Sequence, residues 1–218
     1  MLGADGRRDS PRDTARLASF LEECRALGSL RGFKHFEVFM RGREEMVLCI
    51  HTKEKRLEPA SLMPNADVIP VSLRDEDLKK DDTFIFLITG YPRYRCPYVY
   101  LRSSHEHLVQ DEDKRMPVTL ETSTAWRTED IPLWRIIAEV ITMVKPERIN
   151  PFQIDMDHLD NMRVEEAVLL TGALLDFLCN MWVAMDPDKM PYMASVYEDI
   201  KALQTRHVGY LFEQASRK

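Results

Sequence analysis

The chain has 218 residues, of which 30 are Lys or Arg and 36 are Asp or Glu, and 44% are hydrophobic. These proportions are ordinary for a soluble globular protein, and a chain of this length can bury a core without disulfides or metals. The net charge of -6, with no clustered basic stretch, argues against a general nucleic-acid binder, because phosphate neutralisation needs a basic surface.

The four cysteines are scattered and form no CxxC pair, so no zinc site is expected and they are interpreted as reduced thiols: Cys24, Cys49, Cys96 and Cys179. The apolar run 164–185 contains Glu165, Glu166 and Asp176 as well as Asn180, and no membrane span is predicted. No secretory signal is recognised, so a cytoplasmic location is expected, with a nuclear or organellar one left open.

The N-terminal region predicts a disordered arm followed by a helix. The arm is assigned to residues 1–12, which are polar. Ser10 and Pro11 are typical of a helix N-cap and a first helical position. Apolar residues then recur at helical spacing from Leu17 to Leu27, and Gly28 is expected to end the helix.

The next hundred residues or so predict β-strands, since short segments rich in aromatic and β-branched residues are separated by turn formers. The segments are 33–40, 45–51, 66–73, 83–88 and 97–101. Strands that follow one another without intervening helices predict an antiparallel meander of four or five strands. The N-terminal helix is expected to cover one face of this sheet.

Helical spacing returns near Ile131 and continues to Val144, with Pro146 expected to end that helix. A strongly apolar helix follows over 164–185, and an amphipathic one runs from Val196 to Leu211. The predicted fold class is therefore α+β: an N-terminal helix, a four-stranded antiparallel meander and C-terminal helices. We expect an α+β domain over 13–160 and a helical extension over 161–218 packed on it.

The segment Thr83–Leu101 places an apolar strand before Tyr91-Pro92 and a second proline, Pro97, at the start of the next strand. This order resembles the third and fourth strands of ubiquitin-conjugating (UBC) domains. Residues 116–120, Trp126 and the helix after it resemble the active-site segment, tryptophan and helix of that family. The resemblance implies a UBC-like fold over roughly residues 13–185.

The resemblance also implies that catalysis has been lost. The family's catalytic cysteine lies about eight residues before the tryptophan, where this chain has Pro117 and Val118, and neither supplies a thiolate. The family's His-Pro-Asn motif is missing, and its nearest remnant is the stretch 104–107. Cys96 is the nearest cysteine, but it lies in the strand turn. The chain is therefore predicted not to be an enzyme and to use no cofactor.

Other sites are less favoured. His105 and His107 could share a metal on a strand, but their polar surroundings are typical of a solvated loop, so no metal is predicted. The acidic run 75–82 is interpreted as a solvated loop as well. A hydrolase is the least favoured class, since the chain has no GxSxG motif and no phosphate-binding glycine loop.

Two segments are predicted to bind a partner, although plain packing remains the alternative for each. Aromatic and arginine side chains anchor many protein interfaces. The strand turn 91–96 is expected to be exposed, and its candidates are Tyr91, Arg93, Tyr94 and Arg95. The candidates in the apolar helix are Phe177, Met181 and Trp182.

The predicted function is a non-catalytic UBC-like interaction module, an adaptor or a structural subunit of a hetero-oligomeric complex. The alternative is an accessory subunit of the UEV type, which binds ubiquitin or pairs with an active conjugating enzyme. Neither reading involves nucleic acid or a membrane span.

Overall fold

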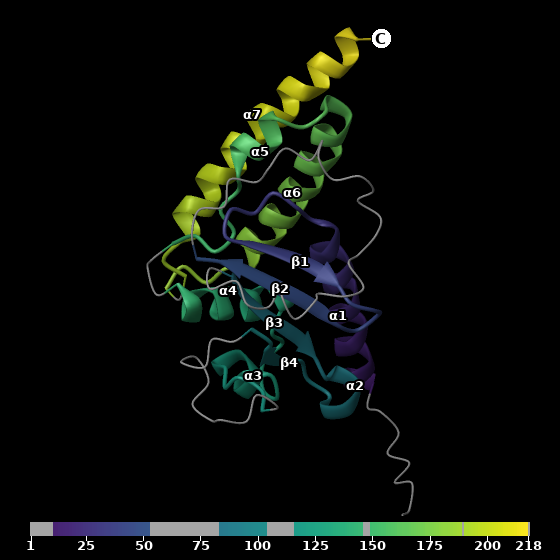
Figure 1. The fold of residues 1–218 in the computed structure, drawn as a ribbon, viewed down its shortest axis with the longest axis vertical. Helices are drawn as coiled ribbons and strands as arrows, with labels where there is room; N and C mark the ends of the chain where they lie inside the picture. The colour runs from purple at the N-terminus through teal and green to yellow at the C-terminus, as the bar shows by residue number, and fades with distance from the viewer. Residues whose placement is uncertain (1–10, 53–82, 104–115, 146–148, 189, 218) are drawn as a thin grey trace, which may run out of the picture.

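The computed structural model describes residues 11–52, 83–103, 116–145, 149–188 and 190–217. Within them, four strands form one antiparallel sheet in chain order (Figure 1): β1 (Phe36–Met40), β2 (Met46–His51), β3 (Thr83–Thr89) and β4 (Tyr98–Leu101). The helices are α1 (Pro11–Ser29), α2 (Tyr91–Tyr94), α3 (Glu121–Ala125), α4 (Leu133–Val144), α5 (Met156–Asp160), α6 (Val164–Ala184) and α7 (Met193–Ser216). The predicted α+β layout is confirmed, and the strand predicted over 66–73 lies outside the described residues.

The sheet buries apolar side chains on both of its faces. Alternate residues of each strand, such as Val38, Leu48 and Phe86, enter the main core. The opposite face carries a second, smaller buried cluster made of Val47, Cys49, Ile85 and Leu87. Strands β2 and β3 are consequently buried on both sides, as their nearly continuous apolar sequences suggest.

Helices α1 and α4 pack on the main-core face of the sheet and on each other. The Glu23 carboxylate of α1 accepts a hydrogen bond of 2.5 Å from the backbone amide of Leu133, and Leu133 is the first residue of α4. This bond satisfies one of the amides that a helix start leaves without an intrahelical partner. Burial raises the pKa of Glu23, and the bond from Leu133 opposes that rise.

The prediction that Gly28 ends the first helix is wrong, because α1 continues to Ser29. Gly28 lies where the helix approaches β1: a Cβ at this position would come within 2.6 Å of Met40 Cγ. The glycine therefore permits close packing between α1 and the sheet.

An aromatic cluster centred on Phe152 joins the sheet to the C-terminal helices. The Phe152 ring lies 5.8 Å from Phe36 of β1 and 5.7 Å from Phe177 of α6. Phe33 and Trp134 complete the cluster, at 6.1 and 6.4 Å from Phe152. Edge-to-face pairs of this kind add to the free energy gained from burying the rings.

Helices α6 and α7 run side by side, at the opposite end of the molecule from α2 and α3 (Figure 1). The Trp182 ring stacks on Tyr197 with centroids 5.6 Å apart, and Thr171 Oγ1 lies 2.8 Å from His207 Nδ1. The wide apolar face of α6 is thus shared between the main core and α7. Among the described helices, α6 is the one long and apolar enough to cross a bilayer by length and composition, a test that core helices of soluble proteins also meet.

Asp199 of α7 connects this helix to the segment that follows α4. Its carboxylate accepts a 2.9 Å hydrogen bond from Asn150 Nδ2, and Asn150 Oδ1 accepts one from the Phe152 amide. Burial raises the pKa of Asp199 to about 6, although the bonds from Ile154 and Asn150 oppose the shift. The folded protein therefore binds the Asp199 proton more tightly than the unfolded chain does.

This linkage predicts a pH dependence of stability. Because the folded pKa exceeds the unfolded one, the stabilising contribution of Asp199 is complete below the unfolded pKa and is lost as pH rises through about 6. We expect urea unfolding to show that the free energy of unfolding of Asp199→Asn rises by about 1 kcal/mol relative to wild type between acidic and neutral pH. This figure is reduced because Asp199 is partly exposed. If the free energies of unfolding of the two proteins changed with pH in the same way, Asp199 would not be the group responsible.

Candidate functional site

Residues 116–120, which were expected to match the catalytic stretch of UBC domains, run beside β4. The Val118 amide donates a 2.7 Å hydrogen bond to the Val99 carbonyl, and the Pro117 and Val118 side chains are half-buried. Neither side chain carries a nucleophile. Cys96 is also half-buried, and burial raises the pKa of its thiol, which lowers the thiolate fraction available for attack.

The turn that contains Tyr91-Pro92 forms the short helix α2 between β3 and β4. Gly90 before it has φ of +98°, in the left-handed region that favours glycine, and a Cβ there would lie 3.2 Å from the Tyr94 ring. Arg95 after it also has a positive φ, of 58°. Pro97 then precedes the first residue of β4. The backbone therefore reverses direction within a few residues.

Tyr91 was expected at the surface with the rest of this turn, and that expectation is wrong. Its side chain is only 3% exposed. The ring stacks on Phe20 of α1 at 5.3 Å and meets the edge of Trp126 at 5.9 Å. Burial raises the pKa of Tyr91 to about 12, so the phenol stays protonated at neutral pH. Tyr91 is therefore a core residue that fastens the turn to α1.

The remaining predicted residues of the turn are exposed: Arg93, Tyr94 and Arg95. Tyr94 is 43% exposed and contacts the Tyr98 ring edge-on at 4.9 Å. The Arg93 guanidinium lies 5.1 Å from the centre of the Tyr94 ring, within the range of a cation–π contact. Arg95 forms a 3.4 Å ion pair with Asp13 of α1.

Strand β4 extends this surface with its outward side chains. Val99 and Leu101 enter the core, whereas Tyr98 and Tyr100 are half-buried on the other side of the strand. The Arg102 guanidinium lies 5.6 Å from the centre of the Tyr100 ring. The exposed Arg127 acts on the same strand, because its positive charge opposes the rise in the pKa of Tyr98. We name the tyrosine–arginine surface by its six members: Arg93, Tyr94, Tyr98, Tyr100, Arg102 and Arg127.

The second predicted partner site, on α6, faces mainly into the molecule. Met181 is 2% exposed, Phe177 belongs to the aromatic cluster and Trp182 stacks on Tyr197. Phe177 and Met181 nevertheless line a groove of about 200 Å³ between α6 and the α1 residues Glu23, Ala26 and Leu27. Packing against α7 and the core accounts for most of the apolar face.

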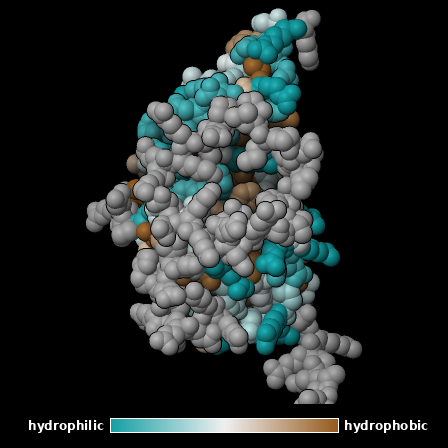
Figure 2. Space-filling model, viewed as in Figure 1, coloured by the Kyte–Doolittle hydropathy of each residue, from teal (hydrophilic) through white to brown (hydrophobic). Residues whose placement is uncertain are grey.

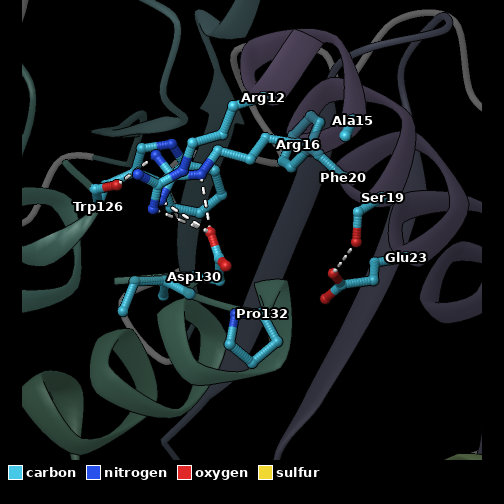
Figure 3. Close-up of a pocket in the computed structure, with 10 residues that line it drawn as sticks. Arg12, Ala15, Arg16, Ser19, Phe20, Glu23, Trp126, Asp130 and Pro132 are labelled. Carbon is cyan, nitrogen blue, oxygen red and sulfur yellow. Dashed lines mark hydrogen bonds and ion pairs between the residues drawn. The ribbon is translucent and has the colours of Figure 1, made fainter. Parts of the chain in front are cut away.

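A groove that the sequence did not indicate lies between α1 and the segment 126–132 (Figure 3). Its volume is about 340 Å³. Arg16 forms one wall: its guanidinium donates to the carbonyls of Trp126 at 2.9 Å and Glu129 at 2.8 Å, and its Nε bonds Asp130 at 2.9 Å. Residues 16 and 130 are far apart in the chain, so no local pattern could have predicted this junction.

Arg16 is expected to hold the segment after α3 against α1. Replacing it with glutamine should lower the free energy of unfolding by about 1–2 kcal/mol, since the part-buried Trp126 carbonyl, the Glu129 carbonyl and the Asp130 carboxylate lose a charged donor. Arg12→Gln is the matched control: Arg12 is 61% exposed and reaches Asp130 only at 3.7 Å, so its loss should have little effect. Chemical denaturation measures both; equal losses would contradict the role of Arg16.

A third surface lies at the end of α7, where apolar side chains are visible in Figure 2. Val208, Leu211 and Phe212 recur at helical spacing and are 50%, 42% and 71% exposed.

Among the described residues, no group of His, Cys, Asp and Glu could hold a metal ion. The His105 and His107 pair lies outside the described residues.

Comparison with known proteins gives a match to one family model. No curated protein matches the chain, and no solved structure does. A family model described as a domain of unknown function, DUF7886, matches residues 72–209, which is more than half of the chain. The match includes β3, β4, α6 and most of α7, and so crosses the boundary expected near residue 160. The chain therefore belongs to the DUF7886 family.

Proposed function

We propose that this chain is a non-catalytic, UBC-like interaction module that acts as an adaptor or a structural subunit of a hetero-oligomeric complex. The observation that carries the proposal is the exposed part of the strand turn. Tyr94 is 43% exposed and is flanked by Arg93 and Arg95, the residue types that most often anchor protein interfaces. Tyr91 and Trp126 support the turn from the core.

Two further features support the proposal. A strand, a Tyr-Pro turn, a second proline and a next strand occur in the order that the UBC resemblance implies. The half-buried segment with Pro117 and Val118 presents no thiol where that resemblance would place a nucleophile. Binding without chemistry is the function that these features favour.

Affinity purification of the tagged chain from its native source tests the proposal. Wild type should retain a stoichiometric protein partner, and Tyr94→Ala should weaken that retention. Phe39→Ala is the matched control, because Phe39 is an aromatic residue of similar exposure, 39%, on β1. Recovery of wild type alone, as a monomer, would refute the proposal.

A separate assay addresses catalysis and ubiquitin. Incubation with activating enzyme, ATP and ubiquitin should give no adduct that a reducing agent cleaves. Such an adduct, lost on Cys96→Ser, would make the chain an enzyme and overturn the non-catalytic part of the proposal. NMR titration with ubiquitin distinguishes the accessory-subunit alternative, which requires shifts that map to one surface.

A further inference from the structure

The residue types of the tyrosine–arginine surface indicate which kind of partner it would bind. We infer that it binds an acidic peptide segment of a partner protein, with the arginines pairing to carboxylates and the tyrosine rings packing on the side chains between them. This inference rests on the proposed function and adds the chemistry of the partner to it.

The six residues come from three separate segments and meet at one surface. Arg93 and Tyr94 lie in α2, Tyr98 and Tyr100 lie in β4, and Arg102 follows β4 directly. Tyr94 contacts Tyr98, and burial and the neighbouring Tyr94 raise the pKa of Tyr100 while Arg93 lowers it.

Arg127, beyond the end of α3, is exposed and acts electrostatically on this surface. The hydrogen bond with Cys96 raises the pKa of Tyr98, and the positive charge of Arg127 opposes that rise. The fold therefore gathers three cations and three phenol rings.

The arginines of this surface differ from most others in the molecule. Arg16, Arg135 and Arg206 are each paired with a carboxylate. Within the part of the chain that the structure describes, Arg93, Arg102 and Arg127 form no ion pair, and the first two instead lie over tyrosine rings. A chain with net charge -6 thus places three arginines here that no carboxylate among the described residues neutralises.

Carboxylates fit this arrangement better than a nucleic-acid backbone does. A guanidinium presents paired N–H donors that match a carboxylate, and an arginine already lying on a ring keeps those donors free at its edge. Nucleic-acid binding requires a longer basic surface, and the acidic net charge opposes it. Complementary charge of this kind favours an acidic peptide segment and speeds its encounter with the surface.

Fluorescence anisotropy with a labelled peptide of Asp, Glu and Leu provides the test, with its Asn/Gln counterpart as the uncharged control peptide. Wild type should bind the acidic peptide, with affinity that falls as salt is added. The triple variant Arg93→Gln/Arg102→Gln/Arg127→Gln should bind about tenfold more weakly. The matched control Arg25→Gln/Arg31→Gln/Arg43→Gln removes three other exposed arginines and should bind like wild type.

Four outcomes would overturn the inference. In the first, both triple variants weaken binding of the acidic peptide equally; in the second, the uncharged peptide binds as well as the acidic one. In the third, a single-stranded oligonucleotide of the same charge binds more tightly than the acidic peptide. In the fourth, the acidic peptide binds only after Glu106, Asp111, Glu112 and Asp113 are neutralised. The last would mean that the chain's own acidic stretch occupies the surface. If the first triple variant still retains the partner in affinity purification, only the acidic chemistry fails and the interaction module stands. If wild type retains no partner, the proposed function fails as well.

Discussion

Replacing Phe152 with alanine is expected to lower the free energy of unfolding by about 3–5 kcal/mol, the range found for truncating a large buried aromatic residue. The side chain is fully buried and lies among rings from β1, α4 and α6. Its removal leaves a cavity that these three elements cannot close together, because each is fixed by its own contacts elsewhere. Urea unfolding followed by circular dichroism measures the loss.

Phe39→Ala is the control for this variant as well. Phe39 is 39% exposed and lies on the opposite side of β1 from the aromatic cluster. Its truncation should cost under about 1 kcal/mol. A loss for Phe152→Ala no larger than that for Phe39→Ala would show that the aromatic cluster does not join the sheet to the C-terminal helices as the distances indicate.

Long elements with a strong period were predictable from the sequence. Helix α4 was expected from Ile131 to Val144 and is observed over Leu133–Val144, because its apolar stripe repeats through three turns. The four strands that the structure describes were expected within a few residues of their observed bounds, and the largest difference is that the first begins at Phe36. Phe33, which had been included in that strand, makes an isolated bridge with Ile154 instead.

Short elements were missed because their stabilisation comes from distant residues. Helix α3 has five residues, too few to show a period. The Glu139 carboxylate of α4 accepts bonds from the Glu121 amide at 2.6 Å and the Thr122 amide at 3.0 Å, so the N-terminus of α3 is capped by another helix. No residue near α3 in the sequence signals this contact.

The candidate site shows the same division. The exposure of Arg93 and Tyr94 followed correctly from the polar turn, since turns lie at the surface. The burial of Tyr91 did not follow, because it depends on α1 reaching the turn, and the two are far apart in the sequence. The groove beside Arg16 was missed for the same reason.

Tyr91 and Tyr94, three residues apart in one turn, should therefore separate stability from binding. Tyr91→Ala removes a ring packed between Phe20 and Trp126, and we expect a loss of about 3–4 kcal/mol in the free energy of unfolding. Tyr91→Phe should cost under about 1 kcal/mol, because the hydroxyl reaches the Asp13 carbonyl only at 3.5 Å. Tyr94→Ala should change stability by under about 1 kcal/mol, since its ring is 43% exposed.

Partner retention should differ between Tyr91→Phe and Tyr94→Ala, the two variants that are expected to stay folded. Tyr91→Phe keeps the ring that supports α2 and should retain the partner as wild type does, whereas Tyr94→Ala should lose retention while its melting curve stays near that of wild type. Measuring both properties on the same preparations separates a binding residue from a packing residue. If Tyr91→Phe lost the partner and Tyr94→Ala kept it, the turn would act on its partner through the buried hydroxyl, and the exposed tyrosine could no longer be the anchor.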